Sequence, residues 1–362
     1  MAAVSGIAGR ADPAARERPP LSVVMPVHNA MPHLPAALDS VLSQTFRDFE
    51  LFIGDDCSSD GSLECIRAYA ARDFRIRFAS SESRMGPVAS SNWVANEARA
   101  PIVARMDADD ISHPRRFELQ MQALAAHPDA AMVGSLYDFI DGHGRRLREG
   151  DRSVLLLGKL VPFAHPTMMY RKDVFDKVGS YREGTDYFED TDLFIRFLKI
   201  GSILVIADTL LSVRLYGASA RLLDDQEVIA RALIMASEQM SIEHGPDKHI
   251  EKITPGNFRA LLEHNLWSGL PPARLFHIIA RMRMKPLGES FLTWLWMGVC
   301  SLSPPLAREI GRLYVSWRNW TTRDLFKPGH VYRWIPGQQA VDLGPLEQTE
   351  NCTSPSVVHT PS

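Results

Sequence analysis

Three acidic clusters in this sequence of 362 residues contain side chains that bind metal ions or move protons. The first is Asp107-Ala108-Asp109-Asp110, in which one residue separates two carboxylates. Carboxylates at this spacing can share a hard divalent cation such as Mg²⁺ or Mn²⁺, with substrate phosphates completing the coordination. The alternative is a polar turn that caps the helix expected near Pro114. The local sequence favours neither interpretation.

The position of the acidic clusters relative to predicted strands favours a binding site. The apolar run 101–106 predicts a short strand that ends at Asp107, and the run 49–53 predicts another that ends at Asp55-Asp56. Open α/β sheets bind ligands at the carboxyl ends of their strands. We therefore expect both clusters to border one crevice, where Asp56 can accept a hydrogen bond from the N–H of a nucleobase.

The third cluster, Glu189-Asp190-Thr191-Asp192, begins a predicted amphipathic helix over 190–199. The helix dipole stabilises carboxylates at this end, which accounts for one or two of them. A carboxylate held at a helix start and facing a crevice can act as a general base. We therefore expect at least one of Glu189 and Asp190 to face the site, whereas a lone histidine such as His165 is more often structural.

Strand and helix patterns alternate from residue 21 to about residue 140 and predict an α/β fold. The expected architecture is a Rossmann-like, mostly parallel central sheet flanked by helices. Beyond residue 140 we expect a hairpin with its turn at 141–144, and a strand over 203–206. The strands expected in the first part are 21–27, 49–53, 75–79, 102–106 and 131–134.

The region after Asp225 predicts a C-terminal helical extension. Its most apolar stretch, 291–302, is too short to span a bilayer. A further amphipathic helix begins at Leu306 and carries several arginines; it either lies on a membrane surface or packs against the preceding domain, and we favour packing. The chain from about residue 340 is polar and rich in Pro, Thr and Ser, which predicts disorder.

Composition and charge exclude several classes of protein. The net charge of −3 gives no reason to expect nucleic-acid binding. Neither GxGxxG nor GxxxxGK[ST] occurs, which argues against dinucleotide oxidoreductases and P-loop enzymes. The four cysteines form no paired framework, and no signal-peptide pattern is found near the start, so we expect a cytoplasmic protein.

The motifs taken together resemble family 2 glycosyltransferases of the GT-A fold. The matching segments are 22–29, 54–62, 106–110, 165–167 and 189–193. The resemblance implies that the last of these supplies the catalytic base, Asp190, with Glu189 beside it. It implies metal binding, Mg²⁺ or Mn²⁺, by Asp109 and less firmly by Asp107. The residues implied to bind the nucleotide sugar are Pro26, Val27, Asn29, Asp56, Asn92, Asp107, Ala108 and Asp109.

The resemblance also implies an acceptor side, to which we assign His165 and Arg214. Some positions depart from the family pattern. Tyr216 stands where many relatives carry a histidine that completes the metal coordination, which leaves a third protein ligand open. Other departures are His28 for Tyr, Cys57 for Gly, and Arg84 for the Asn of an NxG segment. No QxxRW motif or set of membrane spans is found, so we expect a non-processive bacterial type of enzyme.

The resemblance divides the chain into four regions. We expect a disordered tail over 1–20, a GT-A domain over 21–220, a helical extension over 221–335 and a disordered tail over 336–362. Membrane association of the helical extension stays open. The domain would have a nucleotide-binding half over 21–110 and an acceptor half over 111–220.

The implied activity is inverting transfer of one sugar from a nucleotide-diphosphate sugar, with a UDP-sugar favoured, to a hydroxyl of a glycan or lipid-linked acceptor. Cell-envelope polysaccharide or glycolipid synthesis, at or near the inner face of the membrane, is the expected setting. Two alternatives stay open. One is a nucleotidyltransferase that uses the same strand-end carboxylates, and the other is a non-catalytic protein that binds nucleotide sugars.

Overall fold

The computed structural model describes residues 18–150, 163–183, 189–215, 327–334 and 340–346. The strands are β1 Leu21–Val27, β2 Phe49–Asp55, β3 Ile76–Ser80, β4 Ile102–Arg105, β5 Ile111–Ser112, β6 Ala130–Ile140, β7 Arg146–Glu149, β8 Met169–Arg171, β9 Ser202–Arg214, β10 His330–Trp334 and β11 Val341–Pro345. The helices are α1 Leu34–Leu42, α2 Ser62–Ala70, α3 Pro87–Asn96, α4 Arg116–Ala126, the 3-10 turn η1 His165–Thr167, α6 Lys172–Val178 and α7 Glu189–Leu198.

The strands form one mixed sheet in the order β11-β10-β9-β6-β8-β4-β1-β2-β3. Its first part is parallel: β1 lies between β2 and β4, and β3 joins the outer side of β2. The buried apolar run of β1 fits this central position, because parallel strands covered on both faces need no polar side. The carboxyl ends of β1, β2 and β4 therefore meet at one edge, as the alternating pattern predicts.

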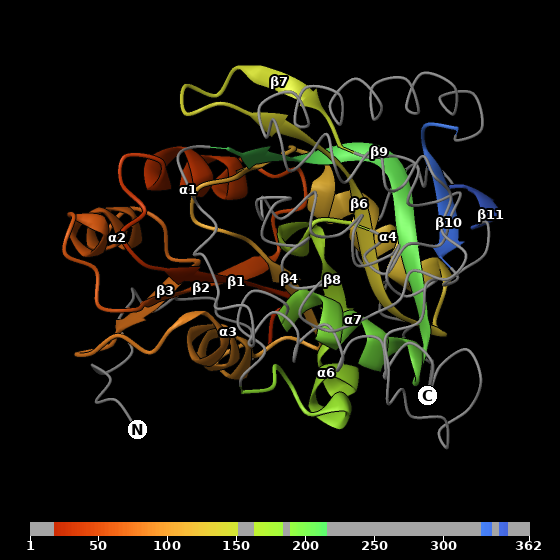
Figure 1. Ribbon diagram of the computed structural model, residues 1–362, viewed down its shortest axis with the longest axis horizontal. Helices are drawn as coiled ribbons and strands as arrows, with labels where there is room; N and C mark the ends of the chain where they lie inside the picture. Colours follow the sequence, from red (N-terminus) through yellow and green to blue (C-terminus); the bar gives the residue numbers. More distant parts are fainter. Residues whose placement is uncertain (1–17, 151–162, 184–188, 216–326, 335–339, 347–362) are drawn as a thin grey trace, which may run out of the picture.

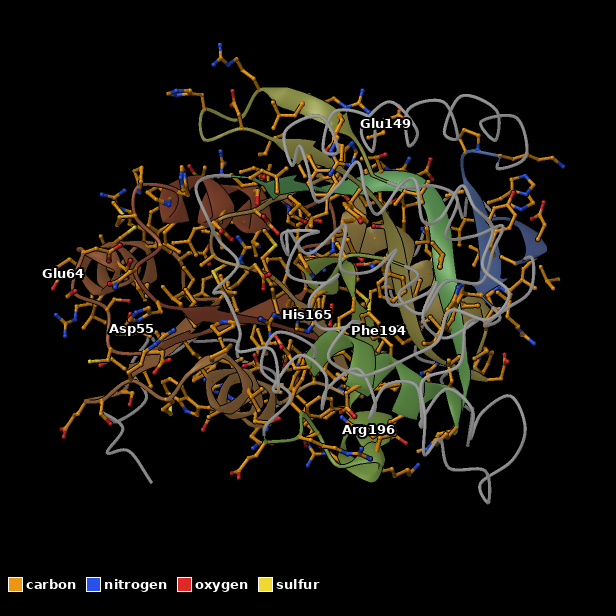
Figure 2. All side chains as sticks on the ribbon, viewed as in Figure 1. Asp55, Glu64, Glu149, His165, Phe194 and Arg196 are labelled. Atoms are coloured by element: carbon orange, nitrogen blue, oxygen red, sulfur yellow. The ribbon has the colours of Figure 1, made fainter. Side chains whose placement is uncertain are left out.

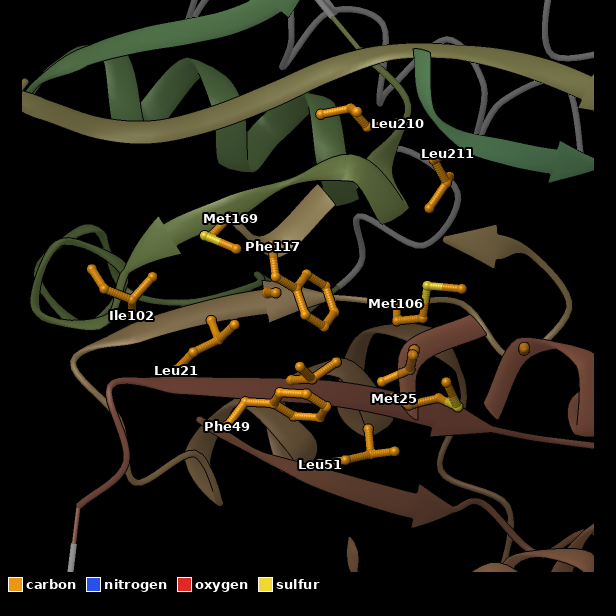
Figure 3. Packing of buried hydrophobic residues seen from close by; sticks show 14 of the residues in the cluster. Leu21, Met25, Phe49, Leu51, Ile102, Met106, Phe117, Met169, Leu210 and Leu211 are labelled. Atoms are coloured by element: carbon orange, nitrogen blue, oxygen red, sulfur yellow. The ribbon is translucent and has the colours of Figure 1, made fainter. Parts of the chain in front are cut away.

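Helices cover both faces of this sheet (Figure 1). α1, α2 and α4 pack on one face, and α3, α6 and α7 pack on the other. Leu34, Leu38 and Val41 lie one helical turn apart on α1 and are fully buried. On the same face, Phe49 and Phe117 meet edge to face with ring centroids 5.6 Å apart (Figure 3). Burial of each such side chain contributes about 1.5–3 kcal/mol to folding.

The second part of the sheet is longer and more mixed than the sequence predicts. β8 pairs antiparallel with both β4 and β6, and β6 pairs parallel with β9 through several irregularities in register. Two antiparallel steps restore the direction of β4, so β6 and β9 also end at the edge where β1, β2 and β4 end. The β6–β7 hairpin, with its turn at 141–144, occurs where it is expected.

The C-terminal strands correct the expectations for residues 330–334 and 341–345, which were a helical extension and a disordered tail. β10 pairs antiparallel with β9 and buries Val331, Tyr332 and Trp334, and β11 pairs with β10. The physical reason is that β9 would otherwise expose a row of unpaired backbone groups. Residues 1–17 of the tail predicted over 1–20, residues 221–326 of the extension predicted over 221–335, and residues 347–362 of the C-terminal tail lie outside the described residues. No described helix is long and apolar enough to cross a membrane.

Candidate active site

The acidic loop, residues 107–110, begins where β4 ends and is held by a buried arginine. The Arg105 Nε donates to Asp107 Oδ1 at 2.9 Å, and its Nη1 donates to Ser91 Oγ of α3 at 2.8 Å. Burial alone would raise the pKa of Asp107, but the Arg105 guanidinium beside it keeps this pKa below its ordinary value. The Asp107 side chain is 32% exposed, so it is both ionised and accessible.

The three carboxylates of the acidic loop lie close together. Asp110 is buried, and one of its oxygens accepts a hydrogen bond from the backbone N–H of Arg214 at 2.9 Å. Burial raises the pKa of Asp110 well above its ordinary value, and the negative charges of Asp109 and Asp107 raise it further. The raised pKa favours the neutral form of Asp110, so the negative charge of the loop comes from Asp107 and Asp109, the two candidate cation ligands.

The donor atoms of Asp107 and Asp109 fit a hard divalent cation. Both are carboxylate oxygens, the ligands that Mg²⁺ and Mn²⁺ prefer. Within the described part of the chain, no group of three or more His, Cys, Asp or Glu side chains is arranged to hold a metal ion. Two protein carboxylates suit an ion that takes its remaining ligands from a diphosphate and water. Tyr216, at the position where many relatives carry a histidine ligand, lies outside the described residues.

Arg214, predicted to lie on the acceptor side, ties the acidic loop to the β6–β7 turn. Its guanidinium donates to the backbone oxygen of Asp109 at 2.7 Å and to those of Asp141 and Gly142 at 2.9 and 3.2 Å. The side chain is buried, consistent with a positioning role. Contact between Arg214 and an acceptor remains a prediction.

Asp56, predicted to recognise the nucleobase, holds the loop that closes over the end of β2. Its Oδ1 accepts from the N–H of Met85 at 2.6 Å, and its Oδ2 accepts from the N–H of Gly86 at 3.0 Å and from Arg84 Nη1 at 2.8 Å. The carboxylate is almost completely buried. Asp56 therefore fixes residues 84–86 at the end of β2, and its contact with a base remains a prediction.

The loops after β1 and β2 are joined by Asn29. This residue has a positive φ of 50° and accepts a hydrogen bond at Oδ1 from the N–H of Ser59 at 2.8 Å, while its own N–H donates to Ser58 Oγ at 3.0 Å. Pro26 and Val27 form the end of β1, next to Gly54 and Asp55 in register. Ala108 is buried between the two candidate metal ligands.

Asn92 positions Tyr181, a residue that no sequence motif marks as functional. Its Nδ2 donates to the backbone oxygen of Tyr181 at 2.7 Å, and its Oδ1 accepts from the N–H of Tyr181 at 2.9 Å. Tyr181 is buried, and its hydroxyl lies 2.8 Å from His165 Nε2. Asn92, predicted to bind the nucleotide sugar, thus connects α3 through Tyr181 to His165, and its contact with the nucleotide sugar remains a prediction.

His165 lies close enough to Arg105, Asp107 and Asp190 to interact with their charges. Figure 2 shows it between Asp55 of β2 and Phe194 of α7, and its ring centroid is 6.4 Å from that of Phe194. Burial lowers the pKa of His165 to about 4, and the positive charge of Arg105 contributes to this. The imidazole is therefore neutral near pH 7 and interacts with Tyr181 as a neutral hydrogen-bonding group.

The start of α7 separates a structural carboxylate from the candidate catalytic ones. Asp192 pairs with Arg196 at 2.6 Å and with Arg182 at 3.2 Å, which explains the third acidic residue of the cluster. Burial raises the pKa of Glu189 to about 7, and the charge of Asp190 adds to this rise. Among the residues that the structure describes, one buried Glu189 oxygen has no hydrogen-bond partner. Glu189 and Asp190 thus lie close enough for their charges to interact, and their part in catalysis remains a prediction.

Arg105, Tyr181 and Arg116 are the residues that sequence reasoning missed. Burial and Asp107 act in opposite directions on the pKa of Arg105, and the net effect is a raised pKa. A charged residue inside the apolar run 102–106 was the available signal, because a buried charge requires a specific partner. Tyr181 has no comparable pattern in the sequence around it.

The fold defines the class of protein to which this chain belongs. S. aureus TarS, solved with UDP, aligns over 88% of this chain and 98% of its own with a TM-score of 0.50 and 16% identity. The mannosyltransferase PcManGT from Pyrobaculum calidifontis, solved with GDP-Man and Mn²⁺, aligns over 89% and 88% with a TM-score of 0.50 and 19% identity. These likenesses show the GT-A fold of glycosyltransferases.

Sequence comparisons then place the chain in a family. Residues 22–179 match the model of glycosyl transferase family 2. The putative glycosyltransferase EpsE of Bacillus subtilis is 33% identical over 51% of this chain and 68% of its own length. The O-antigen biosynthesis glycosyltransferase WbnJ of Escherichia coli is 34% identical over 49% of this chain and 71% of its own. The chain is therefore a family 2 glycosyltransferase, as the order of its motifs predicts.

Proposed function

We propose that this glycosyltransferase moves one sugar from a nucleotide-diphosphate sugar, with a UDP-sugar favoured, to an acceptor hydroxyl with inversion at the anomeric carbon. One observation carries the proposal: the acidic loop, the Asp56 loop and the Glu189-Asp190 pair all border the carboxyl ends of the same strands. Complexes of the structural neighbours with UDP and with GDP-Man and Mn²⁺ support a nucleotide-sugar donor.

The donor lies across the ends of β1, β2 and β4 in this proposal. Asp56 recognises the base, and the acidic loop lies beside the diphosphate. Asp107 and Asp109 would hold Mg²⁺ or Mn²⁺, which would supply positive charge beside the leaving diphosphate. The remaining donor contacts are assigned to Pro26, Val27, Asn29, Asn92 and Ala108.

Asp190 serves as the general base. It takes the proton of the acceptor hydroxyl while that oxygen attacks the anomeric carbon from the face opposite the diphosphate, so a single displacement inverts the centre. The transition state has oxocarbenium character, as in glycoside hydrolysis. Glu189, with a pKa of about 7, shares the pocket and holds a proton over part of the neutral range.

His165 and Arg214 border the acceptor in this proposal. A neutral imidazole suits a hydroxyl-rich acceptor, because it can either donate or accept a hydrogen bond. The names of relatives that act in O-antigen and amylovoran biosynthesis support a glycan or lipid-linked acceptor of the cell envelope. We accordingly propose a cytoplasmic location, peripheral to the membrane, and no nucleic-acid partner.

The Asp190→Asn variant tests the assignment of the base. We expect sugar transfer to fall by about 10²–10⁴-fold, because an amide cannot accept the proton. The affinity for UDP with Mn²⁺ should stay within about twofold of wild type, since the base does not hold the nucleotide. Asp176→Asn, at an exposed position of α6, is the matched control and should change neither quantity. Wild-type transfer by Asp190→Asn would refute the assignment.

The donor and the type of reaction need separate measurements. A thermal-shift screen with UDP-, GDP- and dTDP-sugars, each with and without Mn²⁺, identifies the donor. The true donor should raise the melting temperature of the protein, because it binds the native state. A glycosyltransferase releases a nucleoside diphosphate, whereas a nucleotidyltransferase releases pyrophosphate. Binding without turnover across a broad acceptor panel would instead indicate a non-catalytic member of the family.

A further inference from the structure

A buried chain of hydrogen bonds connects the end of β4 to the turn that carries His165. Arg116 Nη2 donates to the backbone oxygen of Arg105 at 2.7 Å, and Arg116 Nε donates to Gln120 Oε1 at 3.0 Å. Gln120 Nε2 then donates to the backbone oxygen of Thr167 at 2.6 Å. Both α4 side chains are fully buried, so water does not interrupt this chain.

Packing alone does not account for a charge at residue 116. Burial lowers the pKa of Arg116 to about 9, and the guanidinium forms no ion pair with any residue that the structure describes. A buried cation without a carboxylate partner is costly, and an apolar side chain of similar volume would fill the space at lower cost. What the guanidinium adds is directional hydrogen bonding, together with positive charge near Asp107 and Asp110.

The two ends of this chain of hydrogen bonds lie in different halves of the proposed site. Arg105 precedes the acidic loop, and Arg116 Nη1 also lies 3.5 Å from the Sδ of Met106. Thr167 closes the η1 turn, where its N–H and Oγ1 both donate to the backbone oxygen of Ala164. The same turn places His165 against Tyr181.

We propose that Arg116 and Gln120 are positioning residues that set the separation between the acidic loop and the His165 turn, and thus between donor and acceptor. This role rests on the proposed function. Its physical basis is that transfer requires the reacting atoms to meet at about 3–3.5 Å, and a misplacement of about 1 Å can lower the rate by about 10²-fold.

The Gln120→Glu variant tests the Thr167 end of the hydrogen-bond chain while keeping the Arg116 end. The new carboxylate still accepts from Arg116 Nε, but it repels the Thr167 oxygen instead of donating to it. UDP with Mn²⁺ should bind within about twofold of wild type, and sugar transfer should fall by about 10²-fold. In wild type, UDP with Mn²⁺ should lower deuterium uptake in a peptide covering residues 164–169, and this protection should be lost in Gln120→Glu.

The Arg116→Lys variant tests the Arg105 end of the hydrogen-bond chain. A lysine amine reaches the Arg105 oxygen or Gln120 but not both, so the acidic loop loses a charged hydrogen bond. We expect the Kd for UDP with Mn²⁺ to rise about tenfold. Leu124→Ala is the control, because Leu124 is buried on the same helix but takes no part in the hydrogen-bond chain. It should lower the melting temperature and leave both the Kd and the protection of residues 164–169 unchanged.

The possible results decide between positioning and packing. If Gln120→Glu keeps the wild-type rate and protection, or if Leu124→Ala loses them to the same extent, the positioning role is refuted. If the wild-type protein binds none of UDP, GDP and dTDP with Mn²⁺, the proposed function fails first and the positioning role fails with it.

Discussion

Glu189 illustrates how a single residue acquires unusual chemistry from its surroundings. Its carboxyl group lies next to Asp190 at the start of α7, and one of its oxygens is buried without a hydrogen-bond partner among the described residues. Burial, followed by the charge of Asp190, raises its pKa from 4.5 to about 7. The folded protein therefore binds this proton more tightly than the unfolded chain does.

The raised pKa predicts a pH-dependent stability. A folded-state pKa above the unfolded value stabilises the protein below about pH 4.5, and this contribution is lost as the pH rises through 7. Glu189→Gln should thus be more stable than wild type above pH 7, by on the order of 2 kcal/mol, and similar at pH 4.5. Urea unfolding at several pH values measures this. Glu183→Gln, at an exposed position, is the control, and a Glu189→Gln difference that does not change with pH would contradict the assignment.

At the scale of elements, two neighbouring helices show the same acid–base spacing in different surroundings. On α7, Asp192 and Arg196 are four residues apart and their side chains are 2% and 3% exposed. On α6, Asp173 and Lys177 have the same spacing but are 65% and 62% exposed. Removal of one partner leaves a buried charge in the first case and a solvated charge in the second.

The two pairs should therefore respond differently to the same substitution. Asp192→Asn should lower the free energy of unfolding by about 3–5 kcal/mol, because it removes one charge of a buried ion pair. Asp173→Asn should lower it by less than about 0.5 kcal/mol. Chemical denaturation of both variants tests this, and equal losses would show that burial of the α7 pair has no energetic consequence.

At the scale of the whole molecule, the sheet joins segments that are distant in sequence. β10 adds to β9 although more than a hundred residues separate them, with Val331 next to Ile206 and Trp334 next to Ile203. Trp334 is almost completely buried in the core on the α3, α6 and α7 face. The C-terminal strands are thus part of the same folded unit as the proposed site (Figure 1).

This arrangement predicts that a substitution near the C-terminal end destabilises the entire domain. Trp334→Ala should lower the free energy of unfolding by about 3–5 kcal/mol, because it leaves a cavity in the core. Val341→Ala, at a position of β11 that is 47% exposed, should change it by no more than about 0.5 kcal/mol. Urea unfolding followed by circular dichroism compares the two. A single cooperative transition at unchanged denaturant concentration in Trp334→Ala would contradict the shared core.

The first part of the fold was accessible to sequence reasoning because its signals are local. The strand 21–27 and the helix with Leu34, Leu38 and Val41 occur where the hydrophobic pattern places them. β6 and β9 extend beyond their predicted ends, because pairing between them stabilises residues whose own pattern is weak. β10 and β11, each five residues long, were missed because strands this short give a weak local pattern and depend on pairing with an available sheet edge.

The sequence by itself determined the family, the order of the acidic motifs and their location at strand ends. These properties depend on residue type and on periodicity along the chain, which are visible without coordinates. Tertiary structure alone decided which groups pair: the Arg105 side chain with that of Asp107, the Asn92 side chain with the backbone of Tyr181, and the Arg116 side chain with that of Gln120. A pattern shows which face of an element is buried, but the partner on that face depends on strand order and register, and these arise from interactions across the whole molecule.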